Sequence, residues 1–207
     1  MNLQVGNRFN FANLPVMRIF TPLKSTFRGP NKQDISIITT NIFFMKKVNF
    51  PIHITEIESL EELSRPEQEL IGLSRSMTRN AYAPYSEFFV GAAVLLENGE
   101  VIKGSNQENA AYPSGLCAER VAVFSASALH PGKKMKAIAI SARSDNQTMD
   151  HPVSPCGACR QVLLEYEVKQ KEAITVFLSG ETGKIYRIEK VRDLLPLSFT
   201  AEDLGKL

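Results

Sequence analysis

The chain contains three cysteines, and all three lie in two short stretches, CAER (residues 117–120) and PCGACR (residues 155–160). Thiolates bind zinc tightly, and three of them leave one of the four tetrahedral positions of the metal open. A structural zinc site is normally closed by a fourth protein ligand, whereas a catalytic site keeps that position for water. The two stretches therefore predict that Cys117, Cys156 and Cys159 bind one zinc ion in an open site, in a fold that brings them together.

Glu119 stands two residues after the first cysteine. A carboxylate at this spacing can accept a proton from water at the open position and pass it on, which is general acid–base catalysis. The combination of Cys-x-Glu with a later Pro-Cys-x-x-Cys is the pattern of zinc deaminases, in which the glutamate is not a ligand. The alternative is that Glu119 is an ordinary exposed glutamate on a helix.

Both cysteine stretches fall where we predict helices to begin. The positive end of a helix favours a thiolate over a thiol, and Pro155 suits a helix start because its missing N–H is not needed there. Cys156 and Cys159 are three residues apart, so they face the same way in a first helical turn. Two neighbouring helix N-termini could therefore surround one metal ion.

Two arginines accompany the cysteines. Three thiolates on a divalent zinc ion carry a net charge of −1, which would raise the pKa of a bound water. We expect at least one arginine, Arg120 before Arg160, to donate hydrogen bonds to the sulfurs and withdraw charge from them. The alternative is that both form ordinary ion pairs on the helix surface.

Other interpretations of the cysteines remain open at this stage. Cys-x-x-Cys alone is also typical of redox pairs and structural zinc sites. A redox pair of Cys156 and Cys159 would leave Cys117 and Glu119 unexplained. A closed zinc site would need a fourth ligand, and His151 is the only histidine near the second stretch.

The pattern of apolar residues predicts an α/β fold, a three-layer sandwich around a mixed five-stranded sheet. A proline followed by acidic residues and an apolar face predicts a helix over residues 66–82, and the Asn98-Gly99 turn predicts a hairpin. Residues 52–57 are a weak candidate for a further short strand. The remaining expected elements are strands over 89–96, 101–104, 136–142, 174–178 and 184–188, and helices over 117–129 and 156–168.

Residues 1–50 form a predicted N-terminal extension outside the catalytic domain, which we place at residues 51–207. The extension has seven Lys and Arg against one Asp and no sustained period. Three interpretations remain open: a disordered or loosely attached tail, an upstream translation with Met45 as the true start, or a basic targeting segment.

The composition limits the partners and the compartment. Residues 51–207 carry 17 basic and 21 acidic side chains, which argues against a nucleic-acid substrate, because such binding depends on neutralising phosphates. No apolar run is long enough to cross a bilayer, so no membrane partner is expected. An odd, small number of cysteines favours a reducing, cytoplasmic location over a disulfide framework.

Together the motifs resemble the cytidine deaminase family, in its small homotetrameric form with three cysteines. The similarity extends over residues 66–204, and Gln107 stands where the family usually has an aliphatic residue. The stretches that carry the resemblance are AYAPYS (81–86) with Phe88 and VGAA (90–93), NQENAAY (106–112), PCGACRQ (155–161), and LLP (194–196) with Phe199.

The resemblance implies a role for each matching residue. Phe88 would pack on the pyrimidine face, Asn106 and Glu108 would bind the ribose hydroxyls, and the backbone of Ala118 and of residues 154–156 would meet the base edge. Phe199 would reach into the site of a neighbouring subunit of a homotetramer. Cys117, Cys156 and Cys159 would bind one zinc ion per subunit, with Glu119 as the acid/base.

The implied activity is hydrolytic deamination of cytidine and 2′-deoxycytidine to uridine and 2′-deoxyuridine, with release of ammonia, in pyrimidine salvage. A free nucleoside is expected as substrate because Glu108 would repel a sugar phosphate. Two alternatives remain open: a deaminase of another aminopyrimidine, and a non-catalytic module stabilised by zinc.

Overall fold

The computed structural model describes residues 46–206, and the chain from Lys47 onward forms one compact unit. The three interpretations of the N-terminal extension concern mainly residues 1–45, which lie outside the described residues. Within residues 46–206, no helix is both long enough and apolar enough to cross a membrane.

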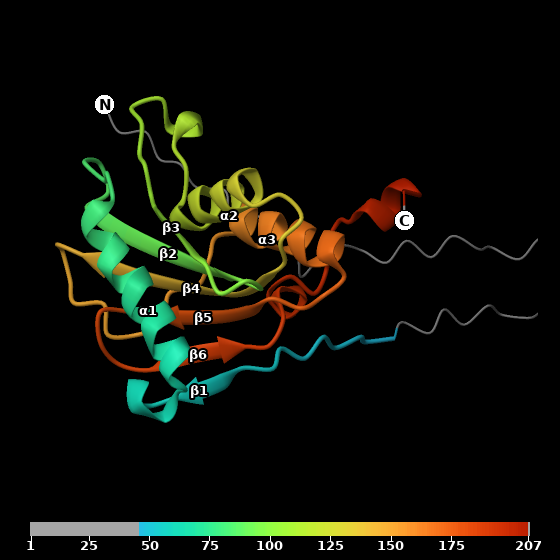
Figure 1. The fold of residues 1–207 in the computed structure, drawn as a ribbon, viewed down its shortest axis with the longest axis horizontal. Helices are drawn as coiled ribbons and strands as arrows, with labels where there is room; N and C mark the ends of the chain where they lie inside the picture. The colour runs from blue at the N-terminus through green and yellow to red at the C-terminus, as the bar shows by residue number, and fades with distance from the viewer. Residues whose placement is uncertain (1–45, 207) are drawn as a thin grey trace, which may run out of the picture. The chain divides into compact units, whose positions relative to one another are not determined.

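Three α-helices and six strands make up this unit (Figure 1). The helices are α1 (Arg65–Met77), α2 (Ala118–Leu129) and α3 (Gly157–Gln170). The strands are β1 (Thr55–Ile57), β2 (Phe88–Leu96), β3 (Val101–Ser105), β4 (Met135–Ser144), β5 (Thr175–Ser179) and β6 (Ile185–Ile188). The helix expected to reach residue 82 ends at Met77 and continues as a 3₁₀ turn, Thr78–Asn80.

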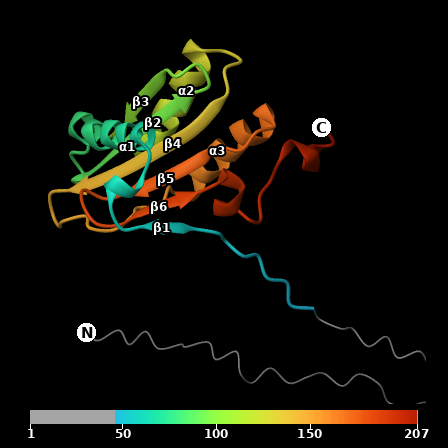
Figure 2. The same ribbon diagram turned by 60° about the horizontal axis from the view of Figure 1, so that its bottom comes forward.

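The strands form one mixed sheet in the order β1-β6-β5-β4-β2-β3, in which only β4 and β5 are parallel. The expected mixed α/β sandwich is confirmed, but the expected number of five strands is wrong. The sixth strand is β1, which confirms the weak candidate at residues 52–57 over its last three residues and pairs with β6 at the sheet edge (Figure 2). A strand of three residues is too short to show a periodic pattern in the sequence. It forms because the partner strand β6 offers hydrogen bonds to it.

Helices cover both faces of the sheet: α1 lies on one face, and α2 and α3 lie on the other (Figure 1). Alternate side chains of each central strand therefore enter two different cores. On β4, Ile138 and Ile140 pack against the α2/α3 side, and Ala137 and Ala139 pack against the α1 side. This double burial explains why the central strands read as continuous apolar runs.

A glycine in β3 lets α2 approach the sheet closely. A Cβ atom at Gly104 would lie 2.7 Å from the carbonyl oxygen of Ala118 and 2.6 Å from the backbone nitrogen of Ala122. Neither backbone atom can move without shifting the helix. Gly104 thus sets the position of the first turn of α2, which begins directly after Cys117.

We expect Gly104→Ala to destabilise the fold by about 1–3 kcal/mol, because overpacking against backbone cannot be relieved by a side-chain rotation. Gly72→Ala is the matched control. Gly72 lies on the exposed side of α1, and a Cβ atom there would have no neighbour within 4 Å, so alanine should stabilise by about 0.5–1 kcal/mol. Urea unfolding of both variants measures the difference; equal stabilities would refute the close approach.

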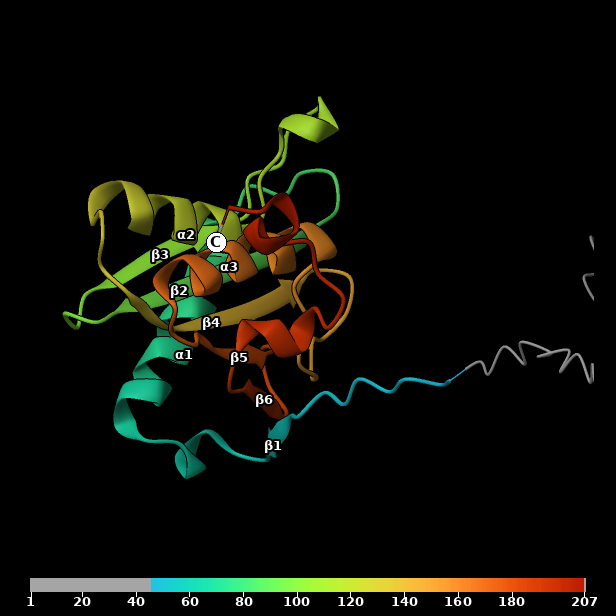
Figure 3. The ribbon, with the colours of Figure 1, turned by 90° about the vertical axis from the view of Figure 1, so that its right-hand side faces the viewer.

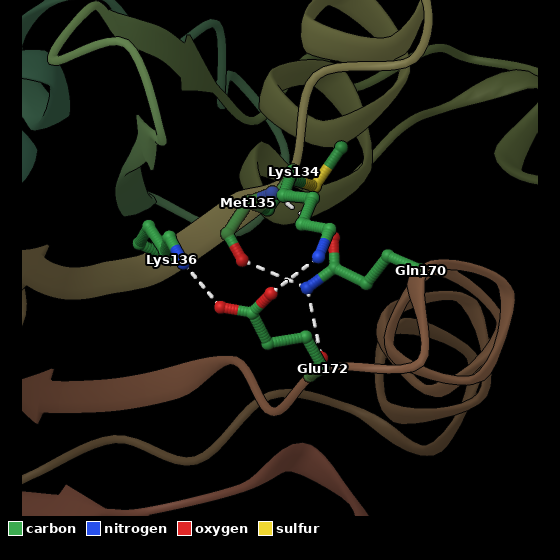
Figure 4. Close-up of polar contacts among 5 residues, drawn as sticks. All are labelled: Lys134, Met135, Lys136, Gln170 and Glu172. Carbon is green, nitrogen blue, oxygen red and sulfur yellow. Dashed lines mark hydrogen bonds and ion pairs between the residues drawn. The ribbon is translucent and has the colours of Figure 1, made fainter.

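Polar contacts fix the far end of α3 to the start of β4 (Figure 4). The side-chain amide of Gln170 accepts from the Met135 N–H at 3.0 Å and donates to the Met135 carbonyl at 2.9 Å. Glu172 accepts hydrogen bonds from Lys134 and Lys136, which lower its pKa to about 2. These contacts hold α3 against the sheet at the end opposite its cysteines.

Candidate metal centre and active site

The N-termini of α2 and α3 carry the three cysteines. Cys117 is the N-cap of α2, Cys156 is the N-cap of α3, and Cys159 lies in the first turn of α3. Both N-cap residues have extended backbone geometry, and neither uses its side chain to cap its own helix. The two N-cap thiols are therefore available to bind a metal ion.

The structure brings the three sulfur atoms together. They all lie within 4.8 Å of one another, and the sulfurs of Cys156 and Cys159 are 3.5 Å apart. Sulfurs bound to one tetrahedral zinc ion at about 2.3 Å are about 3.8 Å apart, so a small adjustment would seat the metal. The residues present thus fit a zinc ion with three thiolate ligands.

The cluster has no fourth ligand among the histidines, cysteines and acids of residues 46–206. His151 is the one candidate for closing the site. It is exposed, and its Nδ1 lies 3.2 Å from Oδ1 of Asp150. The geometry therefore favours the open type of zinc site over the closed, structural type.

Arg120 contacts the cluster. Its Nη2 lies 3.5 Å from the sulfur of Cys117, and its buried Nε has no hydrogen-bond partner within the described part of the chain. A hydrogen bond from the Cys159 thiol, and then the one from Arg120, lower the pKa of Cys117 to about 5. The same bond to Cys117, together with burial, raises the pKa of Cys159. The surroundings of Cys117 therefore favour its thiolate form, which is the form that binds a metal ion.

Arg160 is placed differently. Its Nε donates to the carbonyl oxygen of Pro155 at 2.9 Å, and its Nη1 donates to that of Leu194 at 3.2 Å. Of the two arginines, Arg120 therefore contacts a sulfur atom, whereas Arg160 binds two backbone carbonyl groups.

Glu119 lies in the first turn of α2 with only 4% of its surface exposed. Burial is the main cause that raises the pKa of its carboxyl group, and the negative charge of Cys117 adds to it. A carboxyl group whose protonated form is favoured in this way is suited to accept and return a proton near neutral pH.

A cavity of about 470 Å³ opens beside the cluster, with Cys117 and Arg120 in its wall. This volume lies within the usual range for small-molecule sites. The rest of the lining comes from the 81–86 turn and the 106–116 loop: Tyr85, Ser86, Asn106, Gln107, Glu108, Asn109, Tyr112, Gly115 and Leu116.

Asn106 and Glu108 both line the cavity, and both side chains also bind their own chain. The amide of Asn106 donates to the Phe88 carbonyl at 2.9 Å and accepts from the Val90 N–H at 2.7 Å. Glu108 accepts from the hydroxyl of Ser86 and from the backbone N–H groups of Tyr85 and Ser86, and these bonds lower its pKa. The sequence motif did not reveal these contacts: Asn106 joins the 106–116 loop to β2, and Glu108 joins it to the 81–86 turn.

Six of the predicted site residues do not line the cavity of this chain: Cys156, Cys159, Glu119, Phe88, Ala118 and Phe199. Phe88 is the half-buried first residue of β2, and Ala118 is the fully buried first residue of α2. Phe199 is 59% exposed, in the segment that follows 3₁₀-helix η5 (Val191–Leu194). An aromatic ring so exposed is available to a partner.

An open site for zinc between two helix N-termini, beside a buried carboxylate and on an α/β sandwich, defines a zinc hydrolase. Comparison with known proteins narrows this class. Residues 64–175 match the model of the "cytidine and deoxycytidylate deaminase zinc-binding region". The chain therefore belongs to the cytidine and deoxycytidylate deaminase family, and zinc is its cofactor.

Individual relatives agree. The chain is 42% identical to a cytidine deaminase of Halalkalibacterium halodurans, over 67% of this chain and 97% of the relative. It is also 42% identical to one of Sporosarcina psychrophila, over 67% of this chain and 94% of the relative. The crystal structure of a cytidine deaminase from Burkholderia pseudomallei superposes with a TM-score of 0.56 at 39% identity, covering 66% of this chain and all of that one.

Proposed function

We propose that this chain is a zinc-dependent hydrolase that deaminates cytidine and 2′-deoxycytidine to the corresponding uridines, releasing ammonia in pyrimidine salvage. The observation that carries the proposal is the convergence of three sulfurs beside the buried Glu119, in a chain that belongs to the deaminase family. Water is the second substrate, and the carbon–nitrogen bond at C4 of the pyrimidine is broken.

The ligands in this proposal are Cys117, Cys156 and Cys159. Zinc, when bound, supplies a Lewis acid that lowers the pKa of a water molecule at its open position. Glu119 takes one proton from the attacking water and delivers it to the ring nitrogen, then takes the second proton from the hydroxyl group now on C4 and delivers it to the departing amino group, which leaves as ammonia. Arg120 disperses the negative charge of the sulfurs through its contact with Cys117.

The polar wall of the cavity fits a nucleoside. Asn106 and Glu108 line it and would bind the ribose hydroxyls. By resemblance to the family, Phe88 would pack against the base and the backbone of Ala118 would meet the base edge. The lowered pKa of Glu108 keeps this carboxylate charged at neutral pH. A phosphate on the sugar would meet that charge, so the free nucleoside is the better substrate.

A panel of four substrates tests the proposal. We expect the zinc-loaded protein to deaminate cytidine and deoxycytidine, and to act on CMP and free cytosine at least about 100-fold less efficiently, since a repelled phosphate or a missing ribose costs a few kcal/mol. The fall in cytidine absorbance and the release of ammonia measure the rate. Activity on cytosine or CMP alone would assign another substrate, and no activity at all would favour the non-catalytic zinc module.

We base the proposed homotetramer on exposed apolar side chains and on the resemblance to the family, and the proposed cytoplasmic location on the family. Large apolar side chains are exposed on the 81–112 region, on α2 and on the C-terminal segment, as expected if these surfaces meet other subunits of a homotetramer. They are Tyr82, Tyr85, Tyr112, Phe124, Leu129, Leu197, Phe199 and Leu204. In this assembly Phe199 enters the site of a neighbouring subunit. The enzyme acts in the cytoplasm, with residues 51–207 as its catalytic domain and residues 1–50 as an extension outside it.

A further inference from the structure

Helix α3 does more than carry two of the three cysteines: its other faces hold the C-terminal segment, residues 191–206. Figure 3 shows this segment, in red, beside α3, in orange. Three side chains of α3 make the polar contacts: Arg160, Gln161 and Glu167. We call these three residues the α3 clamp.

Glu167 binds the beginning of 3₁₀-helix η5. The residue is only 8% exposed, and its carboxylate accepts from the N–H groups of Val191 at 2.7 Å and Arg192 at 3.0 Å, the first two residues of η5. It also accepts from the N–H of Ile174 at 3.0 Å, just ahead of β5. Both oxygens of a buried carboxylate thus accept from backbone N–H groups, which come from two later parts of the chain.

Arg160 binds the other end of the same 3₁₀-helix. Its donation to the carbonyl of Leu194, the last residue of η5, places a positive group at the negative end of the helix, as Glu167 places a negative group at the positive end. Arg160 also holds the carbonyl of Pro155, the residue directly before Cys156. One guanidinium therefore ties the cysteine turn to the C-terminal segment.

Gln161 extends the connection to the aromatic residue of that segment. Its Nε2 donates to the carbonyl oxygen of Phe199 at 2.7 Å. The backbone of Phe199 is therefore held by the residue that follows Arg160 in α3, two positions after Cys159.

We propose that Arg160, Gln161 and Glu167 are positioning residues, which fix the C-terminal segment and its Phe199 relative to the Pro155–Cys156 turn. The metal-binding helix is then the common support for the catalytic centre of its own subunit and for the aromatic residue it presents outward. The catalytic part of this inference rests on the proposed function; the structural part does not.

Four variants of the full-length protein test the clamp. Glu167→Gln replaces two acceptor oxygens by one and turns an N–H donor toward backbone N–H groups. Arg160→Met removes both bonds to carbonyls, and Arg160→Lys keeps a charge that can reach one of them. Glu165→Gln is the matched control, because Glu165 lies on the exposed side of the same helix.

The first readout is hydrogen exchange of separate peptides. We expect Glu167→Gln and Arg160→Met to speed amide exchange in residues 191–206 at least about tenfold while the β2 and β4 peptides stay protected, with Arg160→Lys in between and Glu165→Gln like the parent protein. Unchanged exchange in residues 191–206, or an equal increase over the whole molecule, would overturn the proposal. If Glu167→Gln does not fold, the two Arg160 variants decide.

The second readout separates positioning from general stability. If Phe199 contributes to substrate binding, Glu167→Gln should raise KM for cytidine about tenfold with kcat changed less than about threefold and zinc content unchanged. A loss of kcat with unchanged KM would contradict the positioning role. If the parent protein does not act on cytidine, the proposed function fails, yet the exchange experiment still judges the clamp.

Discussion

Glu119→Gln is expected to retain zinc and lose turnover by about 10²- to 10⁴-fold, the usual contribution of a general acid–base group. The amide has nearly the same shape and can still accept a hydrogen bond, but it cannot carry a proton. The substitution should lower kcat and leave KM nearly unchanged, because proton transfer stabilises the transition state and does not contribute to substrate binding. The decrease in cytidine absorbance measures kcat, and metal analysis of the same sample measures zinc.

Stability provides the control for this variant. Burial raises the pKa of Glu119, so folding disfavours its charged form at neutral pH. A neutral amide removes that cost, and the melting temperature should not fall. A folded, zinc-loaded Glu119→Gln enzyme with near-normal kcat would show that another group moves the proton.

Cys117→Ala is expected to abolish both zinc binding and activity. Cys117 is the only ligand contributed by the α2 side of the cluster, so its loss leaves two thiolates on one helix. The Arg120 side chain also loses its sulfur partner. We expect zinc content to fall from about one ion per chain to near zero, with a lower melting temperature than the parent holoenzyme, because a ligand that binds only the folded state stabilises it.

Cys117→His is the matched control. Zinc deaminases use either histidine or cysteine at this position, so the imidazole should retain the metal and part of the activity. Metal analysis after dialysis against a weak chelator compares the two variants. Stoichiometric zinc in Cys117→Ala would mean that the metal site is built from other residues.

The metal cluster could be anticipated because its signals are local. Each of the two helix N-termini is marked by a cysteine within a few residues. The cluster then forms if the two N-termini lie side by side in the fold. The contacts of Asn106 and Glu108 could not be anticipated in the same way. The amide of Asn106 reaches β2 because Ser105 pairs with Gly91, and this register belongs to the sheet rather than to the motif.

The clamp was hidden for a related reason. In the sequence, Glu167 is one more charged residue of a predicted helix. Its burial arises because Ile174, Val191 and Arg192 return to it from later segments with N–H groups that need an acceptor. Strand β1, for which the sequence carries only a weak signal, depends on residues 185–187 of β6 for its hydrogen bonds. Such features belong to the assembled fold.

The short strand β1 also determines how far the chain can be trimmed. The family match begins at residue 64, which suggests a tempting start for a minimal enzyme. A protein that started there would lose β1 and the buried side chains of Ile57 and Leu63, and would leave the backbone of β6 as an open edge. Unpaired edges invite strand-to-strand aggregation, so a soluble crystallisation fragment should begin ahead of Thr55.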